Sequence, residues 1–523
     1  MGNGKIKYIT TPLYYVNDEP HVGHAYTNIM ADTLARYYRL MGEDVFFLTG
    51  TDEHGQKIER VAKERNETPQ ELADRLVGVF KKLWVELEIS NNDFIRTTEP
   101  RHIKAVQIFF GKLFDKGDIY KGVYEGWYCT PCETFLTETQ LSSGLCPDCG
   151  RKVEKLQEDS YFFKMSKYAL PLLKHIEESP YFIEPLSRRS EVINFIKSGL
   201  KDLSVTRTSF NWGVSLNNDE NHVVYVWFDA LLNYISAPGY MKDNELFNKI
   251  WPCDVHFIGK DILKFHAVIW PCMLLAADLK LPNKVFAHGW WTVDGKKMSK
   301  SLGNVVKPFE IIKKYGADPF RYFLLREVTP GLDGDFSEDA LIQRFNSDLA
   351  NDLGNLLHRT LNMVEKYCGG KVPENYALNE DIDKELIEKT SSLIQEIPDI
   401  LSHIRLNELL IKIWGIISKA NKYIEVTAPY SLAKKPECNK RLFTIMYNLL
   451  EVLRIISILI YPFMPQTAEK MKRQLGYEDH YFAQKNLNYS GKWGLMISGT
   501  NINKEGPLFP RIEIEGREVF NVF

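Results

Sequence analysis

The sequence predicts an α/β fold with a parallel sheet, followed by a bundle of helices. Three observations support this prediction. Strand and helix patterns alternate over the first fifty residues and again after residue 220, which is typical of βαβ units. A stretch of different character, roughly residues 115–220, lies between them and contains clustered cysteines and many aromatic residues. From about residue 340 the strand patterns fade, and long amphipathic patterns predict a helical bundle.

The elements of the first half are predicted in order from local patterns. Residues Lys5–Thr10 form a short β-rich run, and a loop containing Pro12 and Pro20 follows. Residues Ala25–Met41 have apolar side chains near helical spacing, and Val45–Thr49 is a second apolar strand. Strand, loop, helix and strand in this order predict a βαβ unit of a Rossmann-like parallel sheet.

The second half repeats the alternation. Residues Val223–Phe228, Asp254–Ile258 and Lys284–His288 are predicted strands, and a helix is predicted from Asp261 to about Ala277. The clearest amphipathic helices of the bundle are Asn351–Tyr367 and Arg405–Ile424. We therefore expect five segments: residues 1–114 and 221–293 as the halves of the Rossmann-like domain, 115–220 as an insertion that splits it, 294–345 as a linker region, and 346–523 as the helical domain with a C-terminal extension.

Size and charge limit the function classes. The 523 residues exceed one ordinary core, so several domains are expected. The net charge is −3, so any nucleic-acid partner must bind a local basic patch. The apolar stretch Leu442–Ile460 contains Asn448, Glu451 and Arg454, which favours a buried bundle helix over a membrane span. The N-terminus has no long apolar segment typical of a signal peptide, so the predicted location is the cytoplasm.

Four of the eight cysteines form a cluster, Cys129-x-x-Cys132 and Cys146-x-x-Cys149, with thirteen residues between the pairs. Two such pairs supply four soft ligands, which suits tetrahedral zinc, and a site without an open position is structural. Redox-active cysteine pairs are the alternative. The sequence predicts one structural zinc ion in the insertion.

Two short motifs indicate nucleotide chemistry. His21-Val22-Gly23-His24 lies at the first strand-to-helix junction, where backbone N–H groups and the helix dipole attract phosphate. Gly23 lacks a Cβ atom, so a flat base could approach the backbone there. The second motif, Lys297-Met298-Ser299-Lys300-Ser301, lies in a polar loop between glycines, and its lysines could neutralise a leaving pyrophosphate.

Together, the two motifs resemble the signature sequences of class I aminoacyl-tRNA synthetases. Longer segments resemble the methionyl members of that family: Ile9 through Asn17 into Pro20-His21, Gly50-Thr51-Asp52-Glu53-His54-Gly55, Tyr225 through Ala230, and Ile258-Gly259-Lys260-Asp261 with Phe265-His266. The resemblance covers essentially the whole chain. It implies that L-methionine is activated with ATP as an adenylate and transferred to tRNA(Met), with release of AMP and pyrophosphate.

The resemblance also implies residue roles. His21, His24, Lys297 and Lys300 would be catalytic and, with Gly23, Gly259 and Asp261, would bind ATP together with magnesium. Asp52 would hold the ammonium group of methionine. The remaining methionine-binding residues would be Leu13, Tyr15, Trp227, Ala230, Tyr234, Ile262, Phe265 and His266. The alternative role of each pocket residue is plain core packing. Asp52 could instead be a helix cap or part of a surface ion pair, and Asp261 could be the N-cap of its own helix.

In the helical part, Asn355 with Arg359 and the segment from Asn421 to Tyr430 resemble the anticodon-reading segments. Asn355 and Arg359 are one helical turn apart and could bond to base edges, and Tyr430 could stack on an unpaired base. The alternative for the first two is a solvated helix face. The family usually has Trp where this chain has Tyr430, and some relatives have Pro where it has Leu231.

Two other functions remain open. Another class I synthetase is one, although the insertion is shorter than the editing insertions of the isoleucyl, leucyl and valyl enzymes. A non-catalytic RNA-binding paralogue is the other, and the intact motifs argue against it. Some relatives carry a further C-terminal dimer-forming domain that is not visible here, so a monomer is expected.

Overall fold

The structure is a computed structural model that describes residues 5–136, 138–147, 149–298, 304–377, 380–477 and 486–513. The chain divides into two compact units. Unit 1 contains Met1–Ala35 and Asp44–Trp290, and unit 2 contains Arg36–Glu43 and Trp291–Phe523.

Unit 1 is built on a six-stranded sheet in which every neighbouring pair is parallel, with the order β3-β2-β1-β12-β13-β7. Its strands are β1 (Lys7–Tyr15), β2 (Val45–Asp52), β3 (Asp93–Arg96), β7 (Ile183–Glu184), β12 (Val255–Gly259) and β13 (Val285–His288). The helices of its first half are α1 (Val22–Leu40), α2 (Gln56–Glu64), α3 (Pro69–Glu86) and α4 (Pro100–Asp115). The prediction of a Rossmann-like parallel sheet is confirmed.

Local sequence signals explain several helix boundaries. Helix α3 begins with Pro69 at its first position and with a capping box in which Thr68 and Glu71 bond each other's backbone N–H groups. Helix α14 ends at Gly369, which has a left-handed φ of 62°.

Two predicted boundaries were wrong. Strand β1 does not end at Thr10 but continues through Pro12 to Tyr15, with a register shift between Thr10 and Leu13. The shift accommodates the proline, which lacks a backbone N–H for the ladder. The strand predicted at Val223–Phe228 ends at Val224, and the helix α7 (Val226–Leu231) follows. An apolar run of this length does not distinguish a buried strand from a buried helix.

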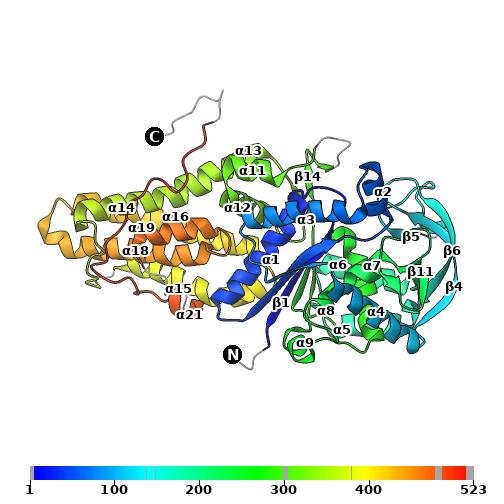
Figure 1. Ribbon diagram of the computed structural model, residues 1–523. Helices are drawn as coiled ribbons and strands as arrows, with labels where there is room; N and C mark the ends of the chain where they lie inside the picture. The colour runs from blue at the N-terminus through cyan, green and yellow to red at the C-terminus, as the bar shows by residue number, and fades with distance from the viewer. Residues whose placement is uncertain are drawn as a thin grey trace. The chain divides into compact units, whose positions relative to one another are not determined.

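The segment between the sheet halves contains a separate antiparallel sheet with the order β5-β4-β6-β8. Its strands are β4 (Ile119–Cys129), β5 (Thr134–Leu136), β6 (Glu154–Phe163) and β8 (Leu203–Ser204). Figure 1 shows β4 and β6 running side by side as a long ribbon, with β5 beside them. The other elements of this segment are α5 (Ala169–Glu178), α6 (Leu186–Lys197), β9 (Thr206–Arg207), β10 (Ser215–Leu216), β11 (Asp219–Val224) and the short 3₁₀ helices Glu138–Gln140 and Met165–Tyr168.

The predicted helix from Asp261 to Ala277 is present in three pieces. These are the 3₁₀ turn Lys260–Ile262, the π-helical turn Phe265–Ile269 (η4) and α10 (Trp270–Ala276). The remaining helices of unit 1 are α8 (Asn233–Ser236) and α9 (Asn244–Ile250). π-helical turns are rare in proteins, and those that occur are often found at functional sites.

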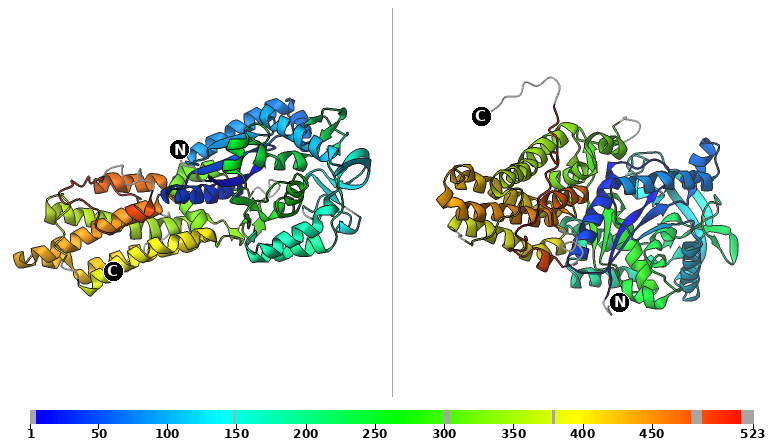
Figure 2. Two further views of the ribbon diagram at one scale, coloured as in Figure 1. Left: turned by 90° about the horizontal axis from the view of Figure 1, so that it is seen from below. Right: turned by 60° about the vertical axis from the view of Figure 1, so that its left-hand side comes forward.

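Unit 2 is mainly helical. Its long helices α14 (Asn355–Cys368), α15 (Asp381–Ser402), α16 (Leu406–Thr427) and α18 (Asn439–Ile460) pack against one another, and both views in Figure 2 show them lying alongside each other. Its other helices are α11 (Pro308–Tyr315), α12 (Ala317–Glu327), α13 (Glu338–Arg344), the π-helical η6 (Phe345–Gly354), α17 (Pro429–Leu432), the 3₁₀ turn Pro436–Cys438, α19 (Pro465–Leu475) and α21 (Leu487–Ser490). A small sheet has the order β15-β14-β16, with β14 (Trp291–Val293), β15 (Lys296–Lys297) and β16 (Gly334–Asp335).

Within the described residues, one helical segment, Pro436–Ile460, is long and apolar enough to cross a membrane, and 94% of its most apolar window is buried inside the protein. Its polar residues Glu451 and Arg454 pair with each other at 2.7 Å and are fully buried. Burial of this kind fits the predicted core helix of a bundle.

Candidate active site

The parallel sheet has one position where its connections change direction. The chain runs from β1 to β2 on one side and from β12 to β13 on the other, and β1 and β12 are neighbours. In open α/β sheets, ligands bind at such a point, beyond the carboxyl ends of the strands. The predicted ATP and methionine residues of unit 1 belong to the elements around this point.

His21 immediately precedes α1 and His24 lies in its first turn, after the loop that follows β1. Their rings stack with centroids 3.8 Å apart at an interplanar angle of 25°. The backbone N–H of His21 donates to His24 Nδ1 over 3.2 Å, and that of Gly23 donates to His21 Nδ1 over 3.1 Å. Since each Nδ1 is an acceptor, the proton of each neutral ring is on Nε2, where it can be donated to a ligand.

Burial keeps both rings neutral near pH 7. It lowers the pKa of His21 to about 4, although the charge of Asp261 opposes the shift, and it lowers the pKa of His24 well below the ordinary value. Gly23 also lies close to one of these rings. A Cβ atom there would lie 2.9 Å from His21 Cε1, so the missing side chain makes room for an imidazole ring.

Gly259 and Asp261 lie at and just beyond the carboxyl end of β12. A Cβ atom on Gly259 would lie 2.5 Å from Asp261 Oδ1, so a side chain at position 259 would displace this carboxylate. The indole N–H of Trp290 donates to the same oxygen over 3.2 Å. Gly259, not Asp261, is the N-cap of the following turn, and Asp261 makes no capping bond. Its exposed carboxylate is thus available to a ligand.

The predicted methionine residues fall into two groups. Leu13 and Tyr15 are on β1, and Tyr15 is in register with Asp52 at the end of β2. The second group lies on α7, α8 and the 3₁₀ and π-helical turns after β12, and its members are Trp227, Ala230, Tyr234, Ile262, Phe265 and His266.

Close contacts join the second group. The rings of Trp227 and Phe265 stack at 3.8 Å and 11°, and His266 lies edge-on to Trp227 at 6.3 Å. His266 Nδ1 is 3.0 Å from the carbonyl oxygen of Ile262, so it carries the proton, and Nε2 then accepts the Tyr234 hydroxyl over 2.8 Å. The Tyr234 O–H is therefore committed to His266, and a ligand thioether would contact mainly aromatic surfaces.

Asp52 is buried, and its Oδ1 has no hydrogen-bond partner. Burial, followed by the nearby charges of Asp229 and Glu133, raises its pKa well above the ordinary value. The N-cap of the next helix is Gly55, so Asp52 is neither a cap nor a surface ion pair. A buried carboxylate with an unused oxygen at the sheet edge is a site for a ligand cation.

Two buried polar features near the candidate site were not predicted from the sequence. One is a buried network in which Asp229 contacts His54 at 2.7 Å and His102 at 2.8 Å, and His102 contacts Ser236 at 2.9 Å. Burial alone would raise the pKa of Asp229, but the two histidines hold it below its ordinary value.

The other feature is Glu133, a buried carboxylate whose Oε1 is 3.3 Å from the Tyr15 hydroxyl. The two residues are 118 positions apart, so no local pattern relates them.

The four clustered cysteines converge as the spacing predicted. Their sulfur atoms all lie within 4.8 Å of one another, with Cys129 and Cys149 at 3.6 Å and Cys132 and Cys146 at 4.0 Å. Four thiolates about 2.3 Å from a tetrahedral zinc ion would be about 3.8 Å apart. The donor set therefore fits structural zinc, and all four cysteines are free of disulfides.

The second motif is largely outside the described residues. Lys300 is not described, and of Lys297 only the backbone is, in β15. The predicted anticodon residues belong to unit 2. Asn355 is exposed and Arg359 half-buried on α14, and Tyr430 on α17 is 52% exposed. These three side chains make no hydrogen bond within the described part of the chain.

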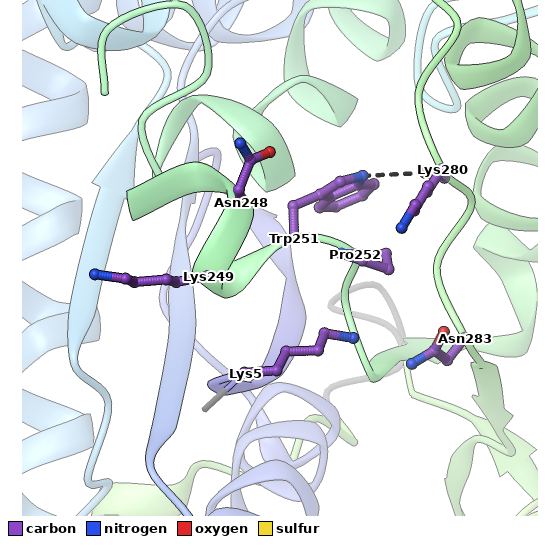
Figure 3. A pocket seen from close by; sticks show the side chains of 7 residues that line it. All are labelled: Lys5, Asn248, Lys249, Trp251, Pro252, Lys280 and Asn283. Atoms are coloured by element: carbon purple, nitrogen blue, oxygen red, sulfur yellow. Dashed lines mark hydrogen bonds between the residues drawn. The ribbon is translucent and has the colours of Figure 1, made fainter. Parts of the chain in front are cut away.

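A separate cavity of about 520 Å³ lies near the amino ends of the strands, away from these residues. Figure 3 shows its lining residues, Lys5, Asn248, Lys249, Trp251, Pro252, Lys280 and Asn283. The indole N–H of Trp251 is bonded to the Lys280 carbonyl at 3.0 Å. Because the residues at the carboxyl edge contribute nothing to it, this cavity is not part of the candidate active site.

Comparison with known proteins agrees with this geometry. Two family profiles match the chain: "tRNA synthetases class I (M)" over residues 7–156 and 149–361, and "Anticodon binding domain of methionyl tRNA ligase" over residues 372–522. The methionine–tRNA ligase of Caldanaerobacter subterraneus subsp. tengcongensis is 54% identical over 98% of this chain and 80% of its own length. The chain belongs to the methionyl-tRNA synthetase family.

Other members of the family are similarly close. The methionine–tRNA ligase of Bacillus subtilis is 49% identical over 97% of this chain and 78% of its own length. The solved Mycobacterium tuberculosis methionyl-tRNA synthetase in complex with methionyl-adenylate is 42% identical, with a TM-score of 0.93 over 97% of this chain and all of that chain. The free form of that enzyme gives a TM-score of 0.86 at 38% identity.

Proposed function

We propose that this chain activates L-methionine with ATP and transfers the methionyl group to tRNA(Met). The observation that carries the proposal is the unsatisfied buried carboxylate of Asp52, which is in register with Tyr15 and lies near Asp229 on α7, the helix that also carries Trp227. A carboxylate binds the ammonium group of an amino acid, and aromatic surfaces suit a thioether side chain. The relatives bear the name methionine–tRNA ligase, and one of them was solved with methionyl-adenylate.

In the proposed reaction, the carboxylate of methionine attacks the α-phosphate of ATP in line and pyrophosphate leaves. His21 and His24 donate Nε2–H bonds to the phosphates, and Asp261 accepts a bond from the ribose. Lys297 and Lys300 neutralise the charge on pyrophosphate as it leaves. A ribose hydroxyl at the tRNA terminus then attacks the adenylate carbonyl and AMP leaves. The residues position reactants and stabilise charge, so no covalent enzyme intermediate is needed.

Two metals belong to this proposal. Cys129, Cys132, Cys146 and Cys149 would hold one zinc ion that stabilises the insertion, while magnesium would accompany the phosphates of ATP. Elemental analysis of freshly purified protein should find about one zinc per chain, and Cys146→Ala should lower that content. A zinc-free preparation of folded protein would refute the metal assignment.

The remaining assignments follow the family. We propose residues 1–114 and 221–293 as the catalytic domain, 115–220 as the insertion that positions the tRNA acceptor end, 294–345 as the linker with the lysine loop, and 346–523 as the anticodon-binding domain. Asn355, Arg359 and Tyr430 would read the anticodon. The proposed enzyme is a cytoplasmic monomer.

The deciding experiment is amino-acid-dependent exchange between ATP and pyrophosphate across all twenty amino acids. Methionine should give strong exchange, and norleucine, which keeps the shape but lacks sulfur, only weak exchange. Stronger exchange with isoleucine or cysteine would indicate another class I synthetase, and no exchange with any amino acid would indicate a non-catalytic RNA-binding protein.

A further inference from the structure

Glu133 directly follows the metal-ligand candidate Cys132, in the turn between β4 and β5. Its backbone is in the left-handed region with φ of 48°, which is unfavourable for a residue with a side chain. The Tyr225 hydroxyl donates to its carbonyl oxygen. Glu133 follows the first cysteine pair, Cys129 and Cys132, whose turn we call the cysteine knuckle. The residue is only 4% exposed. The turn therefore directs a carboxylate into the protein interior.

The carboxylate contacts three separate parts of unit 1. Its Oε1 lies 3.3 Å from the Tyr15 hydroxyl on β1 and 3.3 Å from the backbone nitrogen of Lys57 on α2, both of which donate to it. Its Oε2 accepts the hydroxyl of Tyr128 on β4. One side chain thus joins the cysteine knuckle to β1 and α2.

The contact with Lys57 supplies a missing helix cap. Helix α2 begins after Gly55, which has no side chain to bond the first N–H groups. Glu133 places a carboxylate at this N-terminus, where the helix dipole favours negative charge. A Cβ atom on Gly55 would lie 2.7 Å from the Tyr15 hydroxyl and 3.3 Å from Glu133 Oε1, so glycine leaves the space in which these groups meet.

These contacts reach the side of the candidate methionine pocket that β1 and β2 form. Tyr15 is a predicted pocket residue, and it is in register with Asp52, the proposed ammonium ligand. Helix α2, whose N-terminus the same carboxylate caps, begins four residues after Asp52. Tyr15 has one O–H, and Glu133 is its acceptor. The position of the Tyr15 ring therefore depends on Glu133.

We propose that Glu133 is a positioning residue for methionine binding that acts by holding the Tyr15 hydroxyl. This inference rests on the proposed function. It gives the cysteine knuckle a role in the amino-acid site in addition to any role toward tRNA.

The test compares Glu133→Ala, Glu133→Gln and Tyr15→Phe with Glu125→Ala as the matched control. Glu125 is on β4 in the same insertion, but its carboxylate is solvent-exposed and pairs with Lys155 on the surface. Methionine binding is followed by intrinsic tryptophan fluorescence without turnover, and KM values for methionine and ATP are obtained from exchange kinetics. Zinc content and thermal unfolding are measured for every variant.

Glu133→Ala should raise the dissociation constant and KM for methionine by roughly three- to tenfold, the effect of losing about one hydrogen bond. The KM for ATP and the zinc content of Glu133→Ala should be unchanged. The Glu125→Ala control should bind methionine as the unmodified protein does. Glu133→Gln, which retains an acceptor oxygen, should have a smaller effect. In a Tyr15→Phe background the effect of either Glu133 variant on methionine binding should largely disappear, because the two residues act through one contact.

Normal methionine binding in Glu133→Ala with only a lower unfolding temperature would overturn the inference and leave a purely structural cap. If Glu133→Ala does not fold, the test uses Glu133→Gln with and without Tyr15→Phe. An equal effect of Glu133→Gln on methionine binding in both backgrounds would refute the inference. Absence of methionine-dependent exchange in the unmodified protein would instead refute the proposed function.

Discussion

At the scale of single residues, the candidate site depends on polar groups that burial has perturbed. Asp52 is buried with one unsatisfied oxygen, and His21 and His24 are stacked and neutral. The unsatisfied Asp52 oxygen is unfavourable in the free protein and becomes favourable when a ligand supplies a positive charge.

Asp52→Asn should weaken methionine binding and stabilise unit 1 at the same time. The substitution removes the charge that attracts the ammonium group, and loss of a charged hydrogen bond of about 1.5–3 kcal/mol raises KM by roughly 10- to 150-fold. Burial raises the pKa of Asp52 in the folded chain above its unfolded value, so its ionisation opposes folding as pH rises through that interval. Thermal unfolding at pH 7 should therefore occur at a higher temperature in the variant. A lower unfolding temperature would show that the carboxylate is satisfied in the free protein.

The buried histidines predict acid sensitivity of unit 1. Burial lowers the pKa of His21 and of His266 to about 4 and that of His256 well below its ordinary value. In the unfolded chain these histidines become protonated near pH 6.5, whereas in the folded chain they stay neutral. Their contribution to the free energy of unfolding should therefore be fully present above pH 6.5 and should be lost as the pH falls toward 4. Denaturant titrations at pH 7, 6 and 5 measure the slope. His256→Gln should reduce proton uptake on unfolding by about one, and an unchanged slope would contradict the assignment.

At the scale of elements, buried charges also organise the helical unit. Glu451 on α18 binds Arg454 through both oxygens and accepts the backbone N–H groups of Gly494, Leu495 and Met496. Arg454 in turn donates to the carbonyl oxygens of Ser490 and Lys492. One ion pair thus fastens the segment after α21 to the central helix of the bundle.

Glu451→Gln should destabilise unit 2 by about 3–5 kcal/mol, because it leaves Arg454 buried without its counterion. The matched control is Glu365→Gln, which breaks the exposed pair with Lys504 in the same unit and should cost less than about 1 kcal/mol. Chemical denaturation followed by circular dichroism compares the two. Equal effects would mean that water reaches the Glu451 pair.

At the scale of the whole molecule, the proposed reaction assigns amino-acid activation and tRNA recognition to different units. The residues for ATP and methionine that the structure describes with side chains belong to unit 1, and the three anticodon residues belong to unit 2. The two partial reactions should therefore respond separately to substitution.

Replacing Asn355, Arg359 and Tyr430 with Ala should weaken charging of tRNA(Met) and leave methionine-dependent exchange nearly unchanged. Loss of the base stack at Tyr430 alone corresponds to roughly 1–3 kcal/mol. Tyr430→Trp should maintain or strengthen the binding of tRNA(Met). Replacement of Tyr376, another exposed aromatic residue of unit 2, should have little effect on it. Comparable losses in both partial reactions would indicate that these residues serve the folding of the bundle.

Local patterns were enough to predict the alternation of strands and helices in the two sheet halves, the cysteine cluster and the two nucleotide motifs, because each depends on spacing along a short stretch of chain. They also indicated the bundle, since apolar periodicity records which helix face is buried. The folded chain was needed to show that β1 passes through Pro12, that Trp227 stacks on Phe265, and that one oxygen of Asp52 has no hydrogen-bond partner. Glu133 shows the reason most clearly: its partners Tyr15 and Lys57 lie 118 and 76 residues away, and such contacts depend on the path of the chain, which no local pattern records.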